Sequence, residues 1–168
     1  MIKKQNFPVE INGRLEWISR SMAAAVFVYS KINGKWYILA NKRGPLMPTN
    51  VGKWNAPSGY LDYNETIEEC GCREVFEETG IRVYPEDLQF MNIDSLPTRA
   101  ENQNVVVRYA TILRKDEDYN GLTSKNAEPG EVDEIRWIDL DDVDNYDWTS
   151  ERHVWCIKNY INMIKDKK

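Results

Sequence analysis

Two Asn-Gly pairs interrupt runs of apolar and polar residues in the first part of the chain. Asn12-Gly13 lies between VEI and RLEWI, and Asn33-Gly34 lies between AVFVYSKI and KWYILA. This dipeptide favours the tight turns with positive φ that join antiparallel strands. The pattern therefore predicts two β-hairpins.

A helix is predicted at residues 66–79, after a break in the pattern. Residues 44–53, GPLMPTNVGK, are rich in Pro and Gly and predict a surface loop. Thr66 followed three positions later by Glu69 forms a capping box, which favours the start of a helix. Gly80 stands where a helix end favours a left-handed residue.

The remaining pattern predicts more strands than helices. Residues 81–84, 88–94, 105–113 and 134–138 are rich in β-branched or aromatic residues and predict strands. Residues 115–130 have no apolar periodicity and predict a long loop. After Ser150, a candidate N-cap, the apolar side chains recur at helical spacing and predict a terminal amphipathic helix (Val154, Ile157, Ile161 and Ile164).

Composition narrows the class of protein. A chain of 168 residues with 42% hydrophobic residues can bury one core, so we expect a single domain. Its 22 Lys and Arg against 27 Asp and Glu give a net charge of −5, which excludes a broad basic surface for polymeric nucleic acid. A few converging cations can still hold a small polyphosphate.

The cysteines and the apolar runs indicate a reduced, cytoplasmic protein. Cys70 and Cys72 would lie about 200° apart around a helix, so they can share neither a metal nor a bridge, and Cys156 makes the count odd. The longest apolar run, residues 22–29, is far shorter than a membrane span, and the N-terminus has no apolar leader. We expect neither secretion nor membrane insertion.

The predicted helix has an acidic face. Glu74, Glu77 and Glu78 fall on one side, and an apolar stripe able to pack into a core lies opposite (Cys72, Val75, Phe76 and Thr79). A cluster of this kind is usually a solvated helix face. Because the carboxylates repel one another, a hard divalent cation such as Mg²⁺ or Mn²⁺ would stabilise them.

A longer pattern favours the metal site over the solvated face. Gly59 is followed after five residues by Glu65 and after seven more by REVFEETGI, which runs from Arg73 to Ile81. This pattern resembles the Nudix box, residues 59–81, at every defining position. The resemblance implies an α/β Nudix fold, with a mixed β-sheet sandwiched between α-helices. It also implies one domain over residues 1–168, with an N-terminal hairpin extension at 1–20 and a C-terminal helix at 150–166.

The resemblance also assigns roles to residues. It implies that the metal ligands are three carboxylates and one main-chain carbonyl (Glu74, Glu77, Glu78 and Ser58). Glu65 and Arg73 would organise the site by a carboxylate–guanidinium contact, and Gly59 and Gly80 would supply turn geometry. Relatives commonly have two glycines at this entry, whereas this chain has Ser58-Gly59, and Ser tolerates positive φ poorly.

The implied reaction is hydrolysis of a phosphoric anhydride. Mg²⁺ or Mn²⁺ would neutralise a diphosphate and activate the water that attacks phosphorus, with Glu77 and Glu78 at the centre. A general base is expected shortly before Trp137. Of the four acids there, we favour Glu131, although each of them could be a solvated loop carboxylate (Glu128, Glu131, Asp133 and Glu134).

The substrate is expected to be a small nucleoside diphosphate linked to another moiety: a nucleotide sugar, a dinucleotide or a nucleoside triphosphate. Lys42 and Arg43 could reach phosphate, and four aromatic residues are candidates for stacking on a base, although most aromatics must be core (Trp17, Trp54, Tyr60 and Tyr63). His153, the only histidine, is expected to pack or to face solvent. The sequence leaves a monomer and a homodimer open.

Two other functions fit parts of the same pattern. A non-catalytic module of the same fold could sense a nucleotide without cleaving it, but the complete set of glutamates in the box favours an enzyme. An isoprenoid diphosphate isomerase would need a cysteine upstream of the helix, and no cysteine precedes Cys70.

Overall fold

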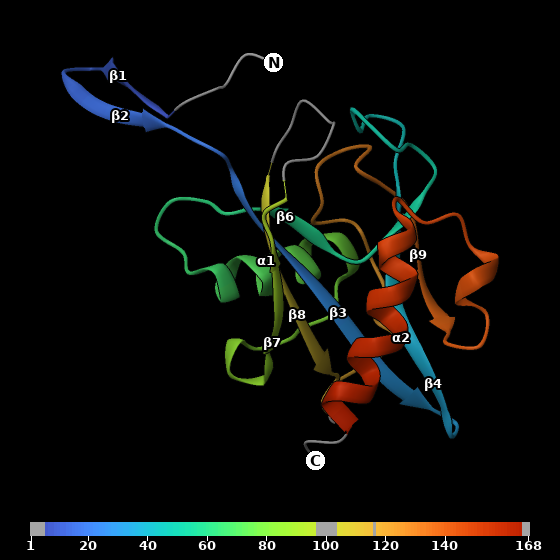
Figure 1. Cartoon of the computed structure of the whole chain (residues 1–168). Coiled ribbons are helices and arrows are strands. Elements are labelled where there is room, and N and C mark those ends of the chain that lie inside the picture. The colour runs from blue at the N-terminus through green and yellow to red at the C-terminus, as the bar shows by residue number, and fades with distance from the viewer. Residues whose placement is uncertain (1–5, 97–103, 116, 166–168) are drawn as a thin grey trace.

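The computed structural model describes residues 6–96, 104–115 and 117–165 (Figure 1). Its strands are β1 (Phe7–Ile11), β2 (Arg14–Ile18), β3 (Met22–Ile32), β4 (Lys35–Arg43), β5 (Trp54–Asn55), β6 (Ser58–Tyr60), β7 (Gln89–Asp94), β8 (Val105–Ile112) and β9 (Val132–Asp139). Its helices are α1 (Ile67–Thr79) and α2 (Glu151–Lys165), with short 3₁₀ turns at Pro85–Asp87 and Val143–Asn145.

Seven of the strands form one mixed sheet. The order along it is β5-β4-β3-β8-β7, while β6 pairs with β3 and β9 pairs with β4. The pairing of β3 with β8 is parallel, and the other pairings in this sheet are antiparallel. The central strand β3 therefore contacts β4, β8 and β6, and its neighbours carry the loops of the candidate site.

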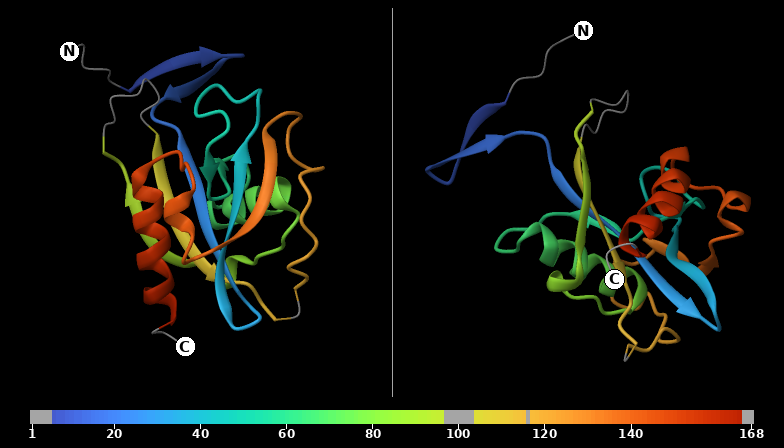
Figure 2. Two further views of the ribbon diagram at one scale, coloured as in Figure 1. Left: turned by 90° about the vertical axis from the view of Figure 1, so that its right-hand side faces the viewer. Right: turned by 60° about the horizontal axis from the view of Figure 1, so that its bottom comes forward.

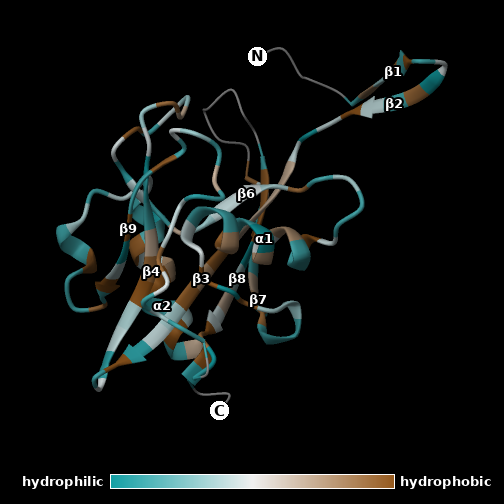
Figure 3. Ribbon diagram, turned by 180° about the vertical axis from the view of Figure 1, so that it is seen from behind, coloured by the Kyte–Doolittle hydropathy of each residue, from teal (hydrophilic) through white to brown (hydrophobic). Residues whose placement is uncertain are grey.

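The two helices cover opposite faces of this sheet, α2 in front and α1 behind in Figure 1. Side chains of β3 alternate between the two layers: Phe27 and Tyr29 pack in the cluster beneath α2, and Val26 and Val28 pack in the cluster beneath α1. Hydrophobic positions follow β3 and β4 in Figure 3. The predicted α/β sandwich is thus confirmed.

Both predicted hairpins are present, with the left-handed backbone that Asn-Gly favours. The φ angles are +52° at Asn12 and +76° at Gly13, and +50° at Asn33 and +85° at Gly34. The hairpin of β1 and β2 stands away from the main sheet (Figure 2), and Trp17 in it is 68% exposed. Residues 1–5 of the predicted extension lie outside the described residues.

The strand predicted at residues 81–84 is wrong. Ile81 and Val83 are buried beneath α1 and Arg82 is exposed, so the alternation is real, but this segment pairs with no strand among the described residues. Pro85 follows and begins a 3₁₀ turn, where it cannot donate a backbone hydrogen bond. Packing against the core, rather than sheet formation, accounts for the pattern.

The later predictions agree with the structure. The described residues of the 115–130 segment contain no helix or strand, as expected. Helix α2 begins after Ser150, whose Oγ accepts from Arg152 N at 3.1 Å. Residue 166, the predicted end of this helix, lies outside the described residues. Neither helix is long and apolar enough within the described chain to cross a membrane.

Candidate active site

Helix α1 is fixed at both ends by its own sequence. Thr66 accepts a hydrogen bond from Glu69 N, and the Glu69 side chain accepts from Thr66 N, so the predicted capping box is confirmed. Gly80 adopts φ +78° and its N–H bonds the carbonyl of Phe76. The acidic face of the helix is therefore held at a defined rotation over the sheet.

Arg73 connects the segment between β6 and α1 with the acidic face of α1. Its Nη2 and Nε lie 2.8 and 3.0 Å from the two oxygens of Glu65, so the expected carboxylate–guanidinium contact is present. Its Nη1 lies 2.7 Å from Glu74 Oε1 and 3.0 Å from Glu77 Oε2, and Nη2 also donates to the Tyr60 carbonyl. The hydrogen bonds from Arg73 lower the pKa of Glu65 to about 2.

Glu74 lies against the backbone of Gly59. A Cβ at Gly59 would stand 2.0 Å from Glu74 Oε1, so a side chain there would displace the carboxylate. The predicted turn role of Gly59 is therefore wrong: this residue lies in β6 without positive φ, and close approach is what requires glycine. Burial, with smaller contributions from the charges of Glu77 and Glu131, raises the pKa of Glu74 to about 7 in spite of Arg73.

Glu78 is the most deeply buried acid of this face, at 4% exposure. Its Oε2 accepts from Ser58 N at 3.0 Å, and Ser58 lies in β6 without positive φ, so serine is accommodated there. Burial, then Glu74, raises the pKa of Glu78 well above its usual range. Within the described residues no cationic side chain forms an ion pair with Glu78.

The donors fit a hard divalent cation. As they stand, no three Asp, Glu, His or Cys side chains of the described chain converge closely enough to enclose an ion. Glu74 and Glu77 nevertheless share one nitrogen of Arg73, and Glu78 is buried without an ion pair among the residues described. Carboxylate oxygens with uncompensated negative charge are what Mg²⁺ and Mn²⁺ prefer.

Glu131 is the acid before Trp137 whose charge acts on the acidic face. It contributes to the raised pKa values of Glu74 and Glu78. Its position is fixed by Gly44 N, which donates to the Glu131 carbonyl at 2.7 Å, and by Glu128 N, which donates to the Glu131 carboxylate at 3.2 Å. The loop at residues 44–53 therefore begins against the residue that is predicted to be the base.

The neighbouring acids have other partners. Asp133 forms an ion pair with Lys42 at 3.0 Å, and Glu134 forms one with Arg136. The positive charge of Lys42 is therefore already paired with the carboxylate of Asp133 in β9. Arg43, in contrast, donates from Nε to a main-chain carbonyl, that of residue 49, at 3.0 Å and lies close enough to Glu78 to lower its pKa.

The aromatic candidates are distributed between core and solvent. Trp54 is 7% exposed and packs edge-on against Tyr146 at 5.4 Å between ring centroids, so it serves the cluster beneath α2. Tyr63 is 91% exposed in the loop that precedes α1. The Tyr60 hydroxyl accepts a hydrogen bond from the amide of residue 104, and Trp17 lies on the separate hairpin.

Two polar residues close to Ser58, Asn55 and Thr149, were not predicted from the sequence. Asn55 Nδ2 donates to Ser58 Oγ at 2.8 Å, and Thr149 Oγ1 donates to Asn55 Oδ1 at 3.2 Å. His153 packs as expected, with its ring stacked on Trp148 and its Nδ1 3.3 Å from Thr149 Oγ1. A polar residue two positions before Pro57 was the only local signal for Asn55.

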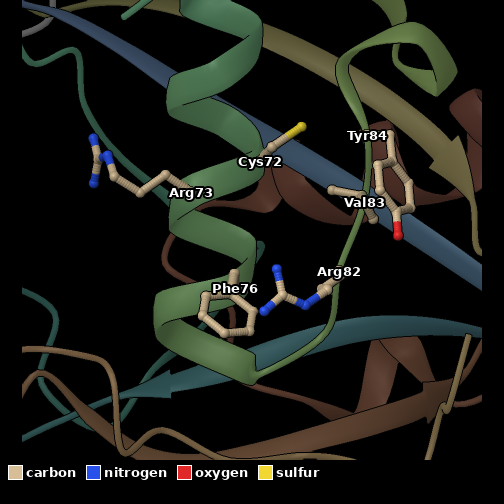
Figure 4. Close-up of a pocket in the computed structure, with 6 residues that line it drawn as sticks. All are labelled: Cys72, Arg73, Phe76, Arg82, Val83 and Tyr84. Atoms are coloured by element: carbon tan, nitrogen blue, oxygen red, sulfur yellow. The ribbon is translucent and has the colours of Figure 1, made fainter.

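A cavity of about 270 Å³ lies on the other side of α1 (Figure 4). It is lined by Cys72, Arg73, Phe76, Arg82, Val83 and Tyr84. The Arg82 guanidinium stacks over the Phe76 ring at 4.2 Å from its centroid. Cys72 and Phe76 project from the helix opposite Glu74, so the cavity lies on the other face of α1, and Arg73 stands between it and the carboxylates.

Comparisons with known proteins agree with this geometry. A family model described as NUDIX domain matches residues 20–156. The chain is similar to the m7GpppN-mRNA hydrolase NUDT17 of Danio rerio, with 22% identity in an alignment of 134 residues that covers 75% of this chain and 44% of that protein. It is also similar to the phosphatase NudJ of Escherichia coli K12, with 24% identity over 54% of each chain. The chain spans about half the length of these curated relatives.

Solved structures share the fold at low identity. The NUDIX domain of Shewanella oneidensis NrtR complexed with ADP ribose aligns with a TM-score of 0.71 and 17% identity, over 88% of this chain and 90% of that one. A binary complex of the C. elegans Ap4A hydrolase aligns with a TM-score of 0.63 and 19% identity, over 87% of this chain and 98% of that one. These likenesses show the same fold.

Proposed function

The chain belongs to the Nudix family, and on this premise we propose that it is a pyrophosphohydrolase that uses Mg²⁺ or Mn²⁺ to cleave a phosphoric anhydride bond. Its substrate is a nucleoside diphosphate linked to another moiety, and water attacks phosphorus. The observation that carries the proposal is the acidic face of α1, where Glu74 and Glu78 are buried beside strand β6 and close to Glu131.

Each residue of this face has a distinct task in the proposal. Glu74, Glu77 and Glu78, with the Ser58 carbonyl, hold the divalent ion, which supplies charge neutralisation and lowers the pKa of water when bound. Arg73 orients Glu74 and Glu77 and is itself anchored on Glu65. A metal ligand that moves by about 1 Å loses much of its catalytic value, so this anchoring matters for rate.

Glu131 is the proposed general base. It accepts the proton of the attacking water, because its carboxylate lies near Glu74 and Glu78 and its backbone is fixed by Gly44. Glu131→Gln is expected to lower kcat while metal binding persists. Asp133→Asn makes the same change two positions along, in a carboxylate paired with Lys42, and serves as the matched control.

The substrate class rests on the anionic diphosphate and on related proteins. ADP ribose and Ap4A, named for the two structural neighbours, are both built on nucleoside phosphates. Arg43 ends β4 at the 44–53 loop, near Glu78, and is the proposed phosphate contact. Tyr63, which is almost fully exposed, is available for stacking on a base.

A substrate panel tests the function. Nucleotide sugars, dinucleotides and nucleoside triphosphates are incubated with the full chain and Mg²⁺, and released nucleotide is measured. Glu78→Gln should reduce turnover by more than about 100-fold, whereas Glu86→Gln, in an exposed pair with Arg114, should not. Absence of metal-dependent turnover on every compound would contradict the proposal.

The second candidate is a nucleotide-binding module without catalysis, favoured by the ADP ribose complex of the Shewanella domain. It predicts tight binding of a compound from the same panel, independent of metal and without release of product. Calorimetry with and without EDTA separates it from the hydrolase.

A further inference from the structure

A series of polar contacts links Thr149, just before α2, to the carboxylate of Glu78. Thr149 Oγ1 donates to Asn55 Oδ1 at 3.2 Å, Asn55 Nδ2 donates to Ser58 Oγ at 2.8 Å, and Ser58 N donates to Glu78 Oε2 at 3.0 Å. Asn55 is 6% exposed, and both ends of its amide are used. This series of contacts includes two residues, Thr149 and Asn55, that are 94 positions apart in the sequence.

The backbone around Asn55 is held independently at several points. Trp54 N donates to the Asp147 carbonyl at 2.8 Å, and Thr149 N donates to the Trp54 carbonyl at 2.9 Å. On the other side, the Pro57 carbonyl accepts from the N–H of residue 26 in β3 at 3.0 Å. With both flanks fixed, the Asn55 side chain is a rigid support for the serine rather than a mobile surface amide.

We infer that Asn55 is a positioning residue, which, together with Thr149, holds Ser58 so that its backbone keeps Glu78 in place for a divalent ion. This inference rests on the proposed function. Ser58 Oγ accepts a hydrogen bond from the Asn55 amide, and Ser58 N donates to Glu78, so a shift of Ser58 would break both contacts. Partners of this kind typically change metal affinity by about 10–100-fold when they are removed.

The test measures Mn²⁺ binding to the full chain without substrate, from the EPR signal of free Mn²⁺, together with kcat and KM. Asn55→Leu, which removes both hydrogen bonds while keeping the branched shape of the side chain, is expected to weaken Mn²⁺ binding by about tenfold. Ser58→Ala keeps the backbone N–H and should have a similar effect. Because the two residues act through one contact, the double variant should be no worse than either single variant.

Thr149 gives a second route to the same answer, should Asn55→Leu fail to fold. Thr149→Val should weaken Mn²⁺ binding, and Thr149→Ser, which keeps the hydroxyl, should restore it. Thr111→Val makes the same change at a buried threonine of β8 and should alter thermal stability without altering Mn²⁺ affinity. At saturating Mn²⁺ the Thr149→Val variant should regain kcat with an unchanged KM.

Two outcomes would overturn the inference. The first leaves the proposed function standing, and the second contradicts it as well. If wild type binds Mn²⁺ and Glu78→Gln does not, but folded Asn55→Leu and Thr149→Val bind as tightly as Thr111→Val, then the positioning role is wrong and the proposed function stands. If the wild-type chain binds no Mn²⁺ and hydrolyses nothing, both proposals are wrong.

Discussion

The backbone of Gly59 and the carboxylate of Glu74 occupy adjoining space, so that a Cβ on residue 59 would lie 2.0 Å from Glu74 Oε1. This contact explains a glycine at the start of the Nudix box without any appeal to turn geometry. It also means that the strand β6 and the helix α1 constrain each other at the candidate metal site.

Gly59→Ala should therefore damage the site rather than the fold alone. The new methyl group must push Glu74 away from Arg73, and we expect metal affinity and kcat to fall by about 10–100-fold. Gly121→Ala is the matched control, because its Cβ would meet nothing closer than 3.5 Å. Mn²⁺ binding and turnover measure the effect, and equal values for the two variants would contradict the steric argument.

Arg73→Ala should destabilise the chain, because it leaves Glu65, Glu74 and Glu77 without their shared cation. We expect a loss of about 2 kcal/mol in the free energy of unfolding, since the guanidinium is only partly buried. Arg73→Lys should recover less than half, because one ammonium cannot replace the fork. Urea unfolding gives the values, and Arg114→Ala, in an exposed pair, should change stability much less.

Under the proposed function, Mg²⁺ or Mn²⁺ should stabilise the folded chain, because the unfolded chain lacks the assembled site that would hold the ion. At 100 times the dissociation constant the expected gain is about 2.7 kcal/mol. Thermal unfolding with Mn²⁺ and then with EDTA measures it. Glu78→Gln should abolish the Mn²⁺-dependent increase, and an increase of equal size in that variant would place the ion elsewhere.

His153 should make stability depend on pH. Burial, then Arg108, lowers its pKa to about 4, below the value of about 6.5 in an unfolded chain. Between pH 6.5 and 4 the unfolded state binds a proton that the folded state excludes. Stability from this source is thus fully present above about pH 6.5 and falls by about 2–3 kcal/mol as the pH drops to 4.

His153→Phe isolates this effect. The carboxylates titrate in both proteins and cancel in the difference, so the variant should lose less stability than wild type between pH 6.5 and 4. Denaturant unfolding at intervals of pH gives the two curves. Parallel curves would show that the pKa of His153 is the same in the folded and the unfolded chain, which would contradict the prediction.

Local signals in the sequence predicted much of this structure. The capping box that starts α1 and the two Asn-Gly turns are settled within about four residues, so neighbouring side chains alone determine them. The segment at 81–84 was misassigned because a buried alternation does not reveal whether a neighbouring strand is available. Register and pairing depend on the whole sheet.

In the candidate site, too, some features follow from the local sequence and others depend on the whole fold. The shared face of Glu74, Glu77 and Glu78 follows from helical spacing, and the contact of Arg73 with Glu65 follows from the resemblance. Two further contacts have no local signature. One joins two side chains 94 positions apart, Thr149 just before α2 and Asn55 in β5, and the other is the close approach of β6 to α1, which only the folded chain reveals.

Strand β3 places alternate side chains in two separate hydrophobic layers, so the stability of each layer depends on the same strand. A cut or a bulky insertion in β3 would remove support from both helices at once, so neither layer can melt while the other survives. The main sheet and its two helices should accordingly lose structure in one concerted event, with circular dichroism and tryptophan fluorescence giving the same midpoint.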